Sequence, residues 1–548
     1  MKKLFVLLIL LYCLTGFGQS YYLTVVGSQE NETMTIDSIG YQQKFTKEDL
    51  LVDEVNHLAE QLQKKGYLES QIITNSKIND STFSYRFDLK NRTDFIHIYI
   101  GEKWKTILDT KSDTLKMHLT ESETYLINLS KKIESKGFSI SKVQLKNITK
   151  KNNYLIADLF IELDKKRVVN DIVINGYDKF PKGFKKNIIK KYKNNTFNQE
   201  SLEKINKDFN NILFVKQLKY PEILFSTDST KVYVFIEKKK NNFFDGFLGF
   251  SNSDNKLIFN GYIDVNLNNI LNSGDIFSLK WKSDGKQQTN FNLGVELPYV
   301  FKSPIGLKLQ LNIFKQDSTF QNSKTNIDLA YYLSNKSKIY FGYQSTESSD
   351  IKNTNTVLLN DFKNHFYTSS FYYVHQQDDF LFPEKTNLFA SIGTGKRNAK
   401  TSSDSQFFGQ LNMNHIIKLN QKNSLFVSLQ NYILLSNNYL TNELYRFGGI
   451  KSIRGFRENS LQANQVNLFF TEYRYKFSPN FYMHSILDYG YYRDKTTNTS
   501  NRPLGFGLGF GLANKGGILN LIYANSIDNK QIIKASNSII HISLKSYF

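Results

Sequence analysis

The spacing of apolar residues divides the chain into two parts. Up to about residue 240, segments with apolar residues every three or four positions alternate with short segments of strict alternation. From residue 244 onward, polar and apolar residues alternate throughout. A period near 3.6 is typical of a helix with one buried face, and a period of two is typical of a strand with two unlike faces. The change at residues 238–240 therefore predicts a domain boundary.

The first part repeats one plan at intervals of roughly 70 to 75 residues, which is typical of an array of similar domains. In the first unit, a strand at 22–26 precedes a helix that Thr46 and Asp49 open as a capping box and Gly66 ends. An alternating strand follows at 83–89. The helix carries apolar residues on one face: Leu51, Val55, Leu58 and Leu62.

The second and third units follow the same plan. The second has a helix at 125–135 and a strand at 155–161, and the third has helices at 184–192 and 199–213 and a strand at 232–236. Each unit can bury one helical face on a small sheet. A single irregular α/β domain is the alternative interpretation. We predict three βααββ-like domains, at 19–92, 93–166 and 167–240.

The alternating region predicts an antiparallel transmembrane β-barrel at residues 241–548. It divides into about sixteen segments of about ten residues, a length that crosses the hydrocarbon layer of a membrane at a tilt. Closure into a barrel removes the open sheet edges that lipid cannot satisfy. The last segment places Ile542, Leu544 and Phe548 on one face, and a final strand with a terminal aromatic is typical of outer-membrane barrels. The predicted fold class is therefore α+β domains followed by a barrel.

The N-terminus has the three parts of a secretory signal peptide. A basic start at residues 1–3 precedes an apolar run at 4–14 and small residues near Gly16. We predict that residues 1–18 are removed and that the protein is exported. Beyond this signal no apolar run reaches the ~18 residues of a spanning helix, which excludes a helical membrane protein. The 44 Phe and 33 Tyr suit barrel strands with aromatic girdles.

A lipoprotein signal is an alternative, because Cys13 is the only cysteine of the chain. Tyr12 precedes it, whereas a lipobox has a small residue there. After cleavage at residue 18 no cysteine remains, so neither a disulfide nor a thiolate zinc site is available. The fold must depend on packing and backbone pairing.

The formal charge of +20 raises the question of nucleic-acid binding, since a basic surface is typical of phosphate recognition. The lysines are scattered along an exported chain, and contact with anionic lipid headgroups accounts for the charge equally well. We therefore predict no nucleic-acid partner.

Catalytic patterns are weak. Residues 391–396 resemble the end of a phosphate-binding loop, but Ala390 replaces the first glycine and Arg397 replaces the Ser or Thr, so we predict a strand and hairpin. No G-x-S-x-G elbow or paired-His motif occurs, and the eight His are dispersed. We predict no catalytic residues, no cofactor and no metal site. An outer-membrane phospholipase is a further hypothesis that lacks a recognisable nucleophile motif.

One segment, residues 445–457, breaks the strand pattern. Here the residues Gly448, Gly449, Arg454, Gly455 and Phe456 resemble the Arg-Gly-Phe/Tyr loop of the BamA/TamA and two-partner-secretion barrels, a family that includes organelle import pores. The loop falls between the eleventh and twelfth predicted strands, where the family has it. A loop that folds back into a barrel needs an anchor, and a forked guanidinium can be held by two carboxylates on neighbouring strands.

Two downstream matches supply those carboxylates. Glu472 lies in a predicted strand, and Asp488 with Gly490 resembles the Phe-x-Asp-x-Gly signature of the family, with Ile486 in place of the aromatic. Strand parity permits both carboxylates to point inward, because apolar residues then point outward. We predict that Arg454 is held inside the barrel by both. Gly455 allows the backbone to approach closely.

The resemblance implies a function. The three upstream units then look like POTRA domains in the periplasm, ahead of a barrel in the outer membrane. They capture unfolded outer-membrane or secreted polypeptides, and the barrel assists insertion into, or passage across, the outer membrane. Gly246, Gly249 and Phe548 mark a weakly paired lateral seam. Outer-membrane lipid and a periplasmic or inner-membrane-anchored protein are the other expected partners. A two-partner-secretion pore with one dedicated substrate is the alternative.

Overall fold

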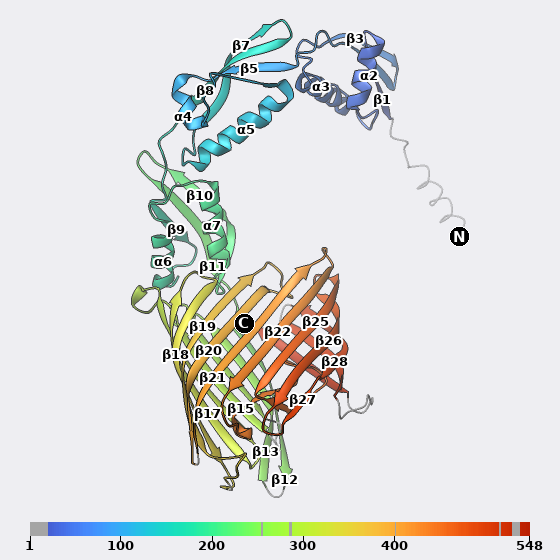
Figure 1. The fold of residues 1–548 in the computed structure, drawn as a ribbon. Coiled ribbons are helices and arrows are strands. Elements are labelled where there is room, and N and C mark those ends of the chain that lie inside the picture. The colour runs from blue at the N-terminus through green and yellow to red at the C-terminus, as the bar shows by residue number, and fades with distance from the viewer. Residues whose placement is uncertain are drawn as a thin grey trace, which may run out of the picture. The chain divides into compact units, whose positions relative to one another are not determined.

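The computed structural model describes residues 20–548 except 254–255, 284–287, 354, 401, 515–516 and 529–537. The predicted signal peptide lies outside the described residues. The chain forms two compact units (Figure 1). One unit extends to Val168 and includes Thr196–Glu200, and the other comprises Val169–Asn195 and Ser201–Phe548.

No described helix is both long and apolar enough to cross a membrane.

The first sheet has the order β2-β1-β4-β3, in which β1 and β4 are parallel and the other pairs antiparallel. Two helices pack against it. Their apolar faces and the sheet share one core, in which Leu51, Val55, Leu58 and Leu62 are buried as predicted. The elements are β1 (Tyr21–Gly27), α2 (Glu30–Ile39), β2 (Lys44–Phe45), α3 (Glu48–Lys64), β3 (Gln71–Asn79) and β4 (Thr82–Asp88).

The second sheet has the corresponding order β6-β5-β8-β7, again with a parallel central pair. Alternate residues of β8 enter its core, including Leu155, Ala157, Leu159 and Ile161. The elements are β5 (Phe95–Tyr99), η1 (Glu102–Trp104), α4 (Lys105–Leu108), β6 (Thr114–His118), α5 (Leu119–Ser135), β7 (Lys142–Lys151) and β8 (Tyr154–Glu162).

The third sheet has the order β10-β11-β9, with β9 and β11 parallel. All three sheets thus share one arrangement, in which the first strand pairs parallel with the last and the last pairs antiparallel with the strand before it. The elements are β9 (Asp171–Asn175), α6 (Lys182–Tyr192), α7 (Gln199–Asn210), β10 (Val215–Phe225) and β11 (Thr230–Lys238).

Several helix boundaries differ from the predictions. Lys47 precedes α3 and no side-chain hydrogen bond caps the helix, so the capping box of Thr46 and Asp49 is wrong. The sequence pattern missed α2, which buries only Ile36 and therefore has little amphipathic signal. The helix α5 begins at Leu119, earlier than predicted. Its first turns pack against the sheet only partly, so their apolar residues do not form a clear helical pattern in the sequence.

The rest of the chain forms a closed antiparallel barrel of sixteen strands, counting β27 and β28 as one strand (Figure 1). The predicted fold class is confirmed. The strands are β12 (Phe243–Ser253), β13 (Lys256–Asn268), β14 (Ile276–Ser283), β15 (Gln288–Leu297), β16 (Ile305–Gln316), β17 (Phe320–Tyr332), β18 (Ser337–Asp350), β19 (Phe362–Gln376), β20 (Glu384–Ala399), β21 (Ser403–Lys418), β22 (Asn423–Leu435), β25 (Gln465–Ser478), β26 (Phe481–Asp494), β27 (Thr499–Asn501), β28 (Leu504–Asn514), β29 (Gly517–Ile527) and β30 (Ile539–Tyr547).

The barrel has an apolar outer face and a polar inner face. Several strands are longer than the ten residues predicted: β19 has 15 residues and β20 and β21 have 16 each. Apolar side chains left exposed on an isolated barrel require an apolar surrounding such as lipid. Those on the outer face include Leu309, Ile327, Leu329, Phe341, Tyr367, Ile392, Leu487, Leu508 and Ile542.

The third small sheet packs directly on the barrel within its unit. Asn269, in the turn between β13 and β14, donates from Nδ2 to the hydroxyl of Tyr177 at 2.7 Å. Asn187 of α6 donates to the carbonyl oxygen of Lys302, in the turn between β15 and β16, at 3.2 Å. The barrel turns and the third domain therefore form one continuous packed region.

Candidate functional site

The predicted motif lies in a long loop, residues 436–464, that joins β22 to β25 (Figure 1). These are the eleventh and twelfth barrel strands, as the sequence predicts. The loop contains η3 (Thr441–Glu443) and a hairpin of β23 (Tyr445–Phe447) and β24 (Leu461–Ala463). We call residues 436–444 the entry segment and residues 448–460 the tip. Several tip residues are buried, so the loop is folded against the barrel wall: Ile453, Arg454 and Phe456.

Arg454 is bound by both predicted carboxylates. Its Nε donates to Asp488 Oδ2 at 2.8 Å and its Nη2 to Asp488 Oδ1 at 2.5 Å. Its backbone N–H also donates to Asp488 Oδ2 at 3.0 Å, and its Nη1 donates to Glu472 Oε1. The exposed fractions are 5% for Arg454, 7% for Glu472 and 0% for Asp488, so water is largely excluded from these charge-assisted bonds.

A second arginine balances the charge of this network. Arg474 on β25 donates from Nε to Glu472 Oε2 at 2.8 Å, and its guanidinium lies over the rings of Phe382 and Phe426. Two guanidinium groups therefore face two carboxylates, which matters because an unpaired buried charge costs several kcal/mol. The sequence motif gave Arg474 no role, although its parity places it on the same face as Glu472.

Two glycines let the tip touch the barrel wall. Gly455 has a φ of +87°, and a Cβ there would collide with the backbone of Asn525 on β29. Ser526 donates from Oγ to the carbonyl oxygen of Gly455 at 2.8 Å. On the wall, Gly505 pairs with Asp488, and its Cβ would collide with the carbonyl oxygen of Arg454. The sequence motif includes Gly455, whereas Gly505 lies outside every motif.

The glycine pair and Phe456 shape the rest of the tip. Gly448 and Gly449 have φ values of +107° and +99°, in the region that favours glycine. Phe456 packs in an apolar cluster with Phe447. Gly490 makes room for this cluster, since its Cβ would lie 2.5 Å from Leu468 Cδ2. The other cluster members are Ile453, Ala463, Val466, Leu468, Phe470 and Tyr492.

Ile486 occupies the position where the family pattern has an aromatic. It is 3% exposed and lies in a small cluster with Ile522 and Ala524, against which Ile450 of the tip packs. An aliphatic contact between the wall and the loop therefore takes the place of the ring.

The predicted seam residues lie where the barrel closes. The described pairing of β12 with β30 consists of Phe243 with Tyr547 and Phe244 with Ser546. The neighbouring pairing of β29 with β30 extends from Gly517–Ser546 to Ala524–Ile539. Phe548 donates its N–H to the carbonyl oxygen of Asn242 at 3.0 Å.

Both seam glycines lie in β12. Gly246 pairs with Ile263 and Gly249 with Asn260 of β13. The strand β12 extends over Phe243–Ser253, so both glycines lie inside it.

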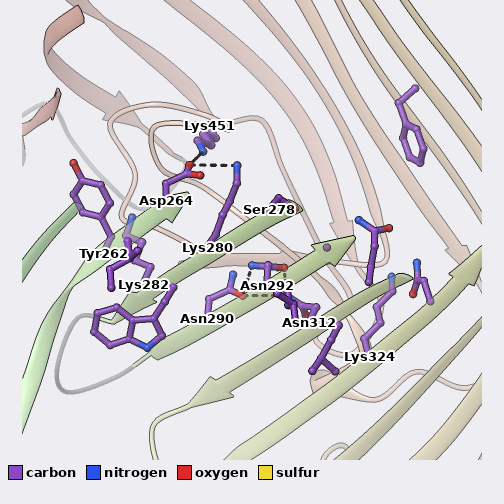
Figure 2. A pocket seen from close by; sticks show the side chains of 18 of the residues that line it. Tyr262, Asp264, Ser278, Lys280, Lys282, Asn290, Asn292, Asn312, Lys324 and Lys451 are labelled. Carbon is purple, nitrogen blue, oxygen red and sulfur yellow. Dashed lines mark hydrogen bonds and ion pairs between the residues drawn. The ribbon is translucent and has the colours of Figure 1, made fainter. Parts of the chain in front are cut away.

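A cavity of about 1190 Å³ lies inside the barrel, and most of the residues that line it are polar. Figure 2 shows Lys280 of β14 and Lys451 of the tip, both directed at Asp264. Their Nζ atoms lie 3.3 and 3.5 Å from Asp264 Oδ2. Asn292 and Asn312 donate to Asn290 Oδ1 at 2.9 and 3.0 Å (Figure 2). The tip thus forms part of the cavity wall.

The structure bears on possible metal ligands and on the segment that resembles a phosphate-binding loop. No group of three His, Cys, Asp or Glu among them is arranged to hold a metal ion. The segment 391–396 lies inside β20 rather than in a loop ahead of a helix, and the hairpin turn comes after Ala399.

Comparisons with known proteins give a fold rather than a sequence family. No family model and no curated protein matches the sequence. Among solved structures, CdiB from Escherichia coli is 12% identical with a TM-score of 0.53, and covers 90% of this chain and 97% of its own. CdiB from Acinetobacter baumannii is 14% identical with a TM-score of 0.51, and covers 91% of this chain and 98% of its own.

BamA from Haemophilus ducreyi lacking POTRA domains 1–3 is 14% identical with a TM-score of 0.48, and covers 82% of this chain and 98% of its own. At these identities the two CdiB structures show a common fold. The chain shares that fold over 90% or more of its length, which confirms, at the level of the fold, the resemblance that the loop motif predicts.

Proposed function

We propose that this protein is an outer-membrane assembly or translocation factor. It captures unfolded polypeptide on POTRA-like domains at 19–92, 93–166 and 167–240, and assists its insertion into or passage across the outer membrane without nucleotide hydrolysis. The observation that carries the proposal is the network of Arg454, Glu472 and Asp488. Three charged residues from separate segments meet in a buried site, at the positions that the family motif specifies.

The outer face of the barrel supports a location in the outer membrane. Its exposed apolar residues need lipid, and its strands form a closed ladder, as a sheet that crosses a membrane requires. The small domains then lie in the periplasm, where exported but unfolded chains pass.

Open sheet edges support capture by strand addition. The strand β3 forms one edge of the first sheet, and all nine of its residues are exposed. It presents Ile72, Ile73 and Ile78 with exposed fractions of 43%, 53% and 63%. Unpaired backbone groups beside apolar side chains are what an incoming strand requires.

The seam supports lateral release. The described contact between β12 and β30 consists of two residue pairs at one end of the strands, Phe243–Tyr547 and Phe244–Ser546. Fewer ladder hydrogen bonds lower the cost of separating two strands. A substrate strand added at β12 therefore has a route from the barrel into the membrane.

A secretion pore is the second candidate, and the cavity is the observation that favours it. A lumen of about 1190 Å³ with lysine and asparagine walls suits a polar chain in transit better than a strand on its way into lipid. In this case the loop is the barrier that the exported chain displaces. Two observations would support the pore. The gene for a large exported protein lies beside the gene for this protein, and depletion of this protein removes that exported protein alone.

The test is quantitative proteomics of the outer membrane and of the medium after depletion of the protein. Broad loss of barrel proteins supports assembly, and loss of one exported protein supports secretion. Unchanged outer-membrane and exported proteins contradict both. The control for general stress is a second strain, in which a periplasmic factor of unrelated fold is depleted until the strain grows at the same rate.

A further inference from the structure

A second buried arginine lies on the barrel wall, outside the family motif. Arg397 on β20 is 0% exposed, and it contacts Asp404 on β21 through Nη2. Its Nη1 contacts Glu443, which belongs to η3 in the entry segment of the loop. Arg397 therefore joins two wall strands to the loop, as Arg454 joins the tip to β25 and β26.

Several further bonds hold the entry segment at this place. Gln406 of β21 donates from Nε2 to Glu443 Oε2 at 2.8 Å, and the N–H of Leu440 donates to Glu443 Oε1 at 2.8 Å. Asn438 donates from Nδ2 to Asp404 Oδ1 at 3.0 Å. Both carboxylates are therefore shared between the wall and the loop.

Asn442 fixes the same segment to a different part of the wall. It is 1% exposed and donates from Nδ2 to Ser348 Oγ at 2.7 Å and to the carbonyl oxygen of Asn360 at 2.8 Å. Asn322 of β17 donates to the carbonyl oxygen of Asn442 at 2.7 Å. The entry segment thus contacts the wall along consecutive strands, from β21 to β17.

A simple cross-strand pair does not account for this arrangement. Arg397 and Asp404 lie opposite each other in the ladder, and Asp404 alone is enough to neutralise one guanidinium. Glu443 adds a second buried carboxylate, which is expensive unless it is bonded on several sides. The backbone pairing of β20 with β21 holds the two strands together without it.

We propose that Arg397, Asp404 and Glu443 form a second anchor, which holds the entry segment independently of the Arg454 anchor at the tip. The two networks share no residue, and β22 separates their strands in the barrel order. Release of Arg454 then frees the tip alone. The lumen opens only when both anchors are released. This inference rests on the proposed function in treating the loop as the barrier of the lumen.

The test uses cysteine labelling in the full-length mature protein. Cys13, the single cysteine of the sequence, lies in the predicted signal peptide, so each introduced cysteine is then the sole labelling site. Ser452→Cys reports on the tip and Leu444→Cys on the entry segment, and both positions are buried, at 8% and 6% exposed. Arg454→Ala should raise the labelling rate at Ser452→Cys roughly tenfold or more, as expected for loss of charge-assisted bonds, and leave Leu444→Cys unchanged.

Arg397→Gln should have the reverse effect, raising the labelling rate at Leu444→Cys and leaving Ser452→Cys unchanged. Planar bilayers then report on the pore. Each single variant should conduct close to the wild-type level, and the double variant should conduct far more than the sum of the two. Equal exposure of both reporters in Arg454→Ala, or no change at Leu444→Cys in Arg397→Gln, overturns the proposal.

Two variants keep the test decisive. If Arg397→Gln gives no heat-modifiable barrel, Glu443→Ala removes the same contact from the loop side and leaves the wall pair of Arg397 and Asp404 intact. Lys363→Gln is the matched control, because Lys363 forms an exposed cross-strand pair with Glu347 on neighbouring strands and should change neither rate. Cysteine labelling needs no substrate. If the proposed function is wrong, the depletion proteomics will show it, but the labelling rates will stay the same.

Discussion

The ring of Phe184 on α6 meets the ring of Tyr299 edge to face, with their centres 4.6 Å apart. Tyr299 lies just after β15, in a turn of the barrel. A Cβ on Gly183 would lie 2.7 Å from Tyr299 Cβ, so helix and turn are in close contact. The third domain is thereby attached to the barrel through aromatic packing and is not a freely jointed module.

We therefore predict that Tyr299→Ala loosens this joint. Loss of a well-packed aromatic costs ~3 to 5 kcal/mol in a core. Trypsin cleavage at the lysines 238–240 should become faster, while the barrel stays heat-modifiable. Tyr220→Ala is the control, because Tyr220 is an exposed tyrosine of the same domain. Equal cleavage rates in the two variants would contradict the attachment of the third domain to the barrel through Tyr299.

The Arg454 anchor predicts loss of activity before loss of folding. Each charge-assisted bond contributes ~1.5 to 3 kcal/mol where water is excluded, but the closed backbone ladder of the barrel does not depend on it. Arg454→Ala should release the tip, and Arg454→Lys should rescue it poorly, because an ammonium lacks the planar fork that bridges two carboxylates.

A double-mutant cycle measures this anchor. Arg454→Ala, Asp488→Ala and the double variant are compared by substrate assembly and by protease access to the loop. The second loss should be much smaller in the background of the first, because the two residues bond directly. If the losses in the two single variants simply add in the double variant, the two residues act separately and the anchor hypothesis is wrong.

Gly505→Ala tests the close approach without changing any charge. Its methyl group would lie 2.3 Å from the Arg454 carbonyl oxygen, so the tip must move away from β28. We expect greater protease access to the tip in a barrel of normal heat modifiability. Gly409→Ala on β21 is the matched control, since its Cβ meets nothing closer than Ile433 Cγ2 at 3.3 Å. A protected tip in Gly505→Ala shows that the wall tolerates a side chain there.

Ile73→Lys tests the open edge of the first domain. A lysine on an edge strand discourages strand addition, and a change at an exposed position alters stability by ~0.5 kcal/mol or less. Crosslinking of the full-length protein to an unfolded barrel polypeptide should fall several-fold. Met34→Lys, on the exposed surface of α2 in the same domain, should not alter it. Equal loss in both variants points to charge rather than to the edge.

The sequence by itself determined the features that depend on local periodicity. Alternation with a period of two required strands with unlike faces, and it placed Glu472 and Asp488 on the inner face while Leu487 and Tyr489 point outward. The four leucine and valine positions of α3 required one buried helical face. The glycines and Arg454 stood out because no regular strand accommodates them at that spacing.

Only the tertiary structure decided which distant residues meet. Arg397 and Glu443 lie in separate segments, and their contact depends on the stagger of the strands, which alternation leaves open because every even shift preserves the same faces. The same reason hid Gly505, whose need for a small residue comes from the carbonyl oxygen of Arg454. The packing of Tyr299 on Phe184 likewise depends on where the third domain docks, and no local pattern contains that information.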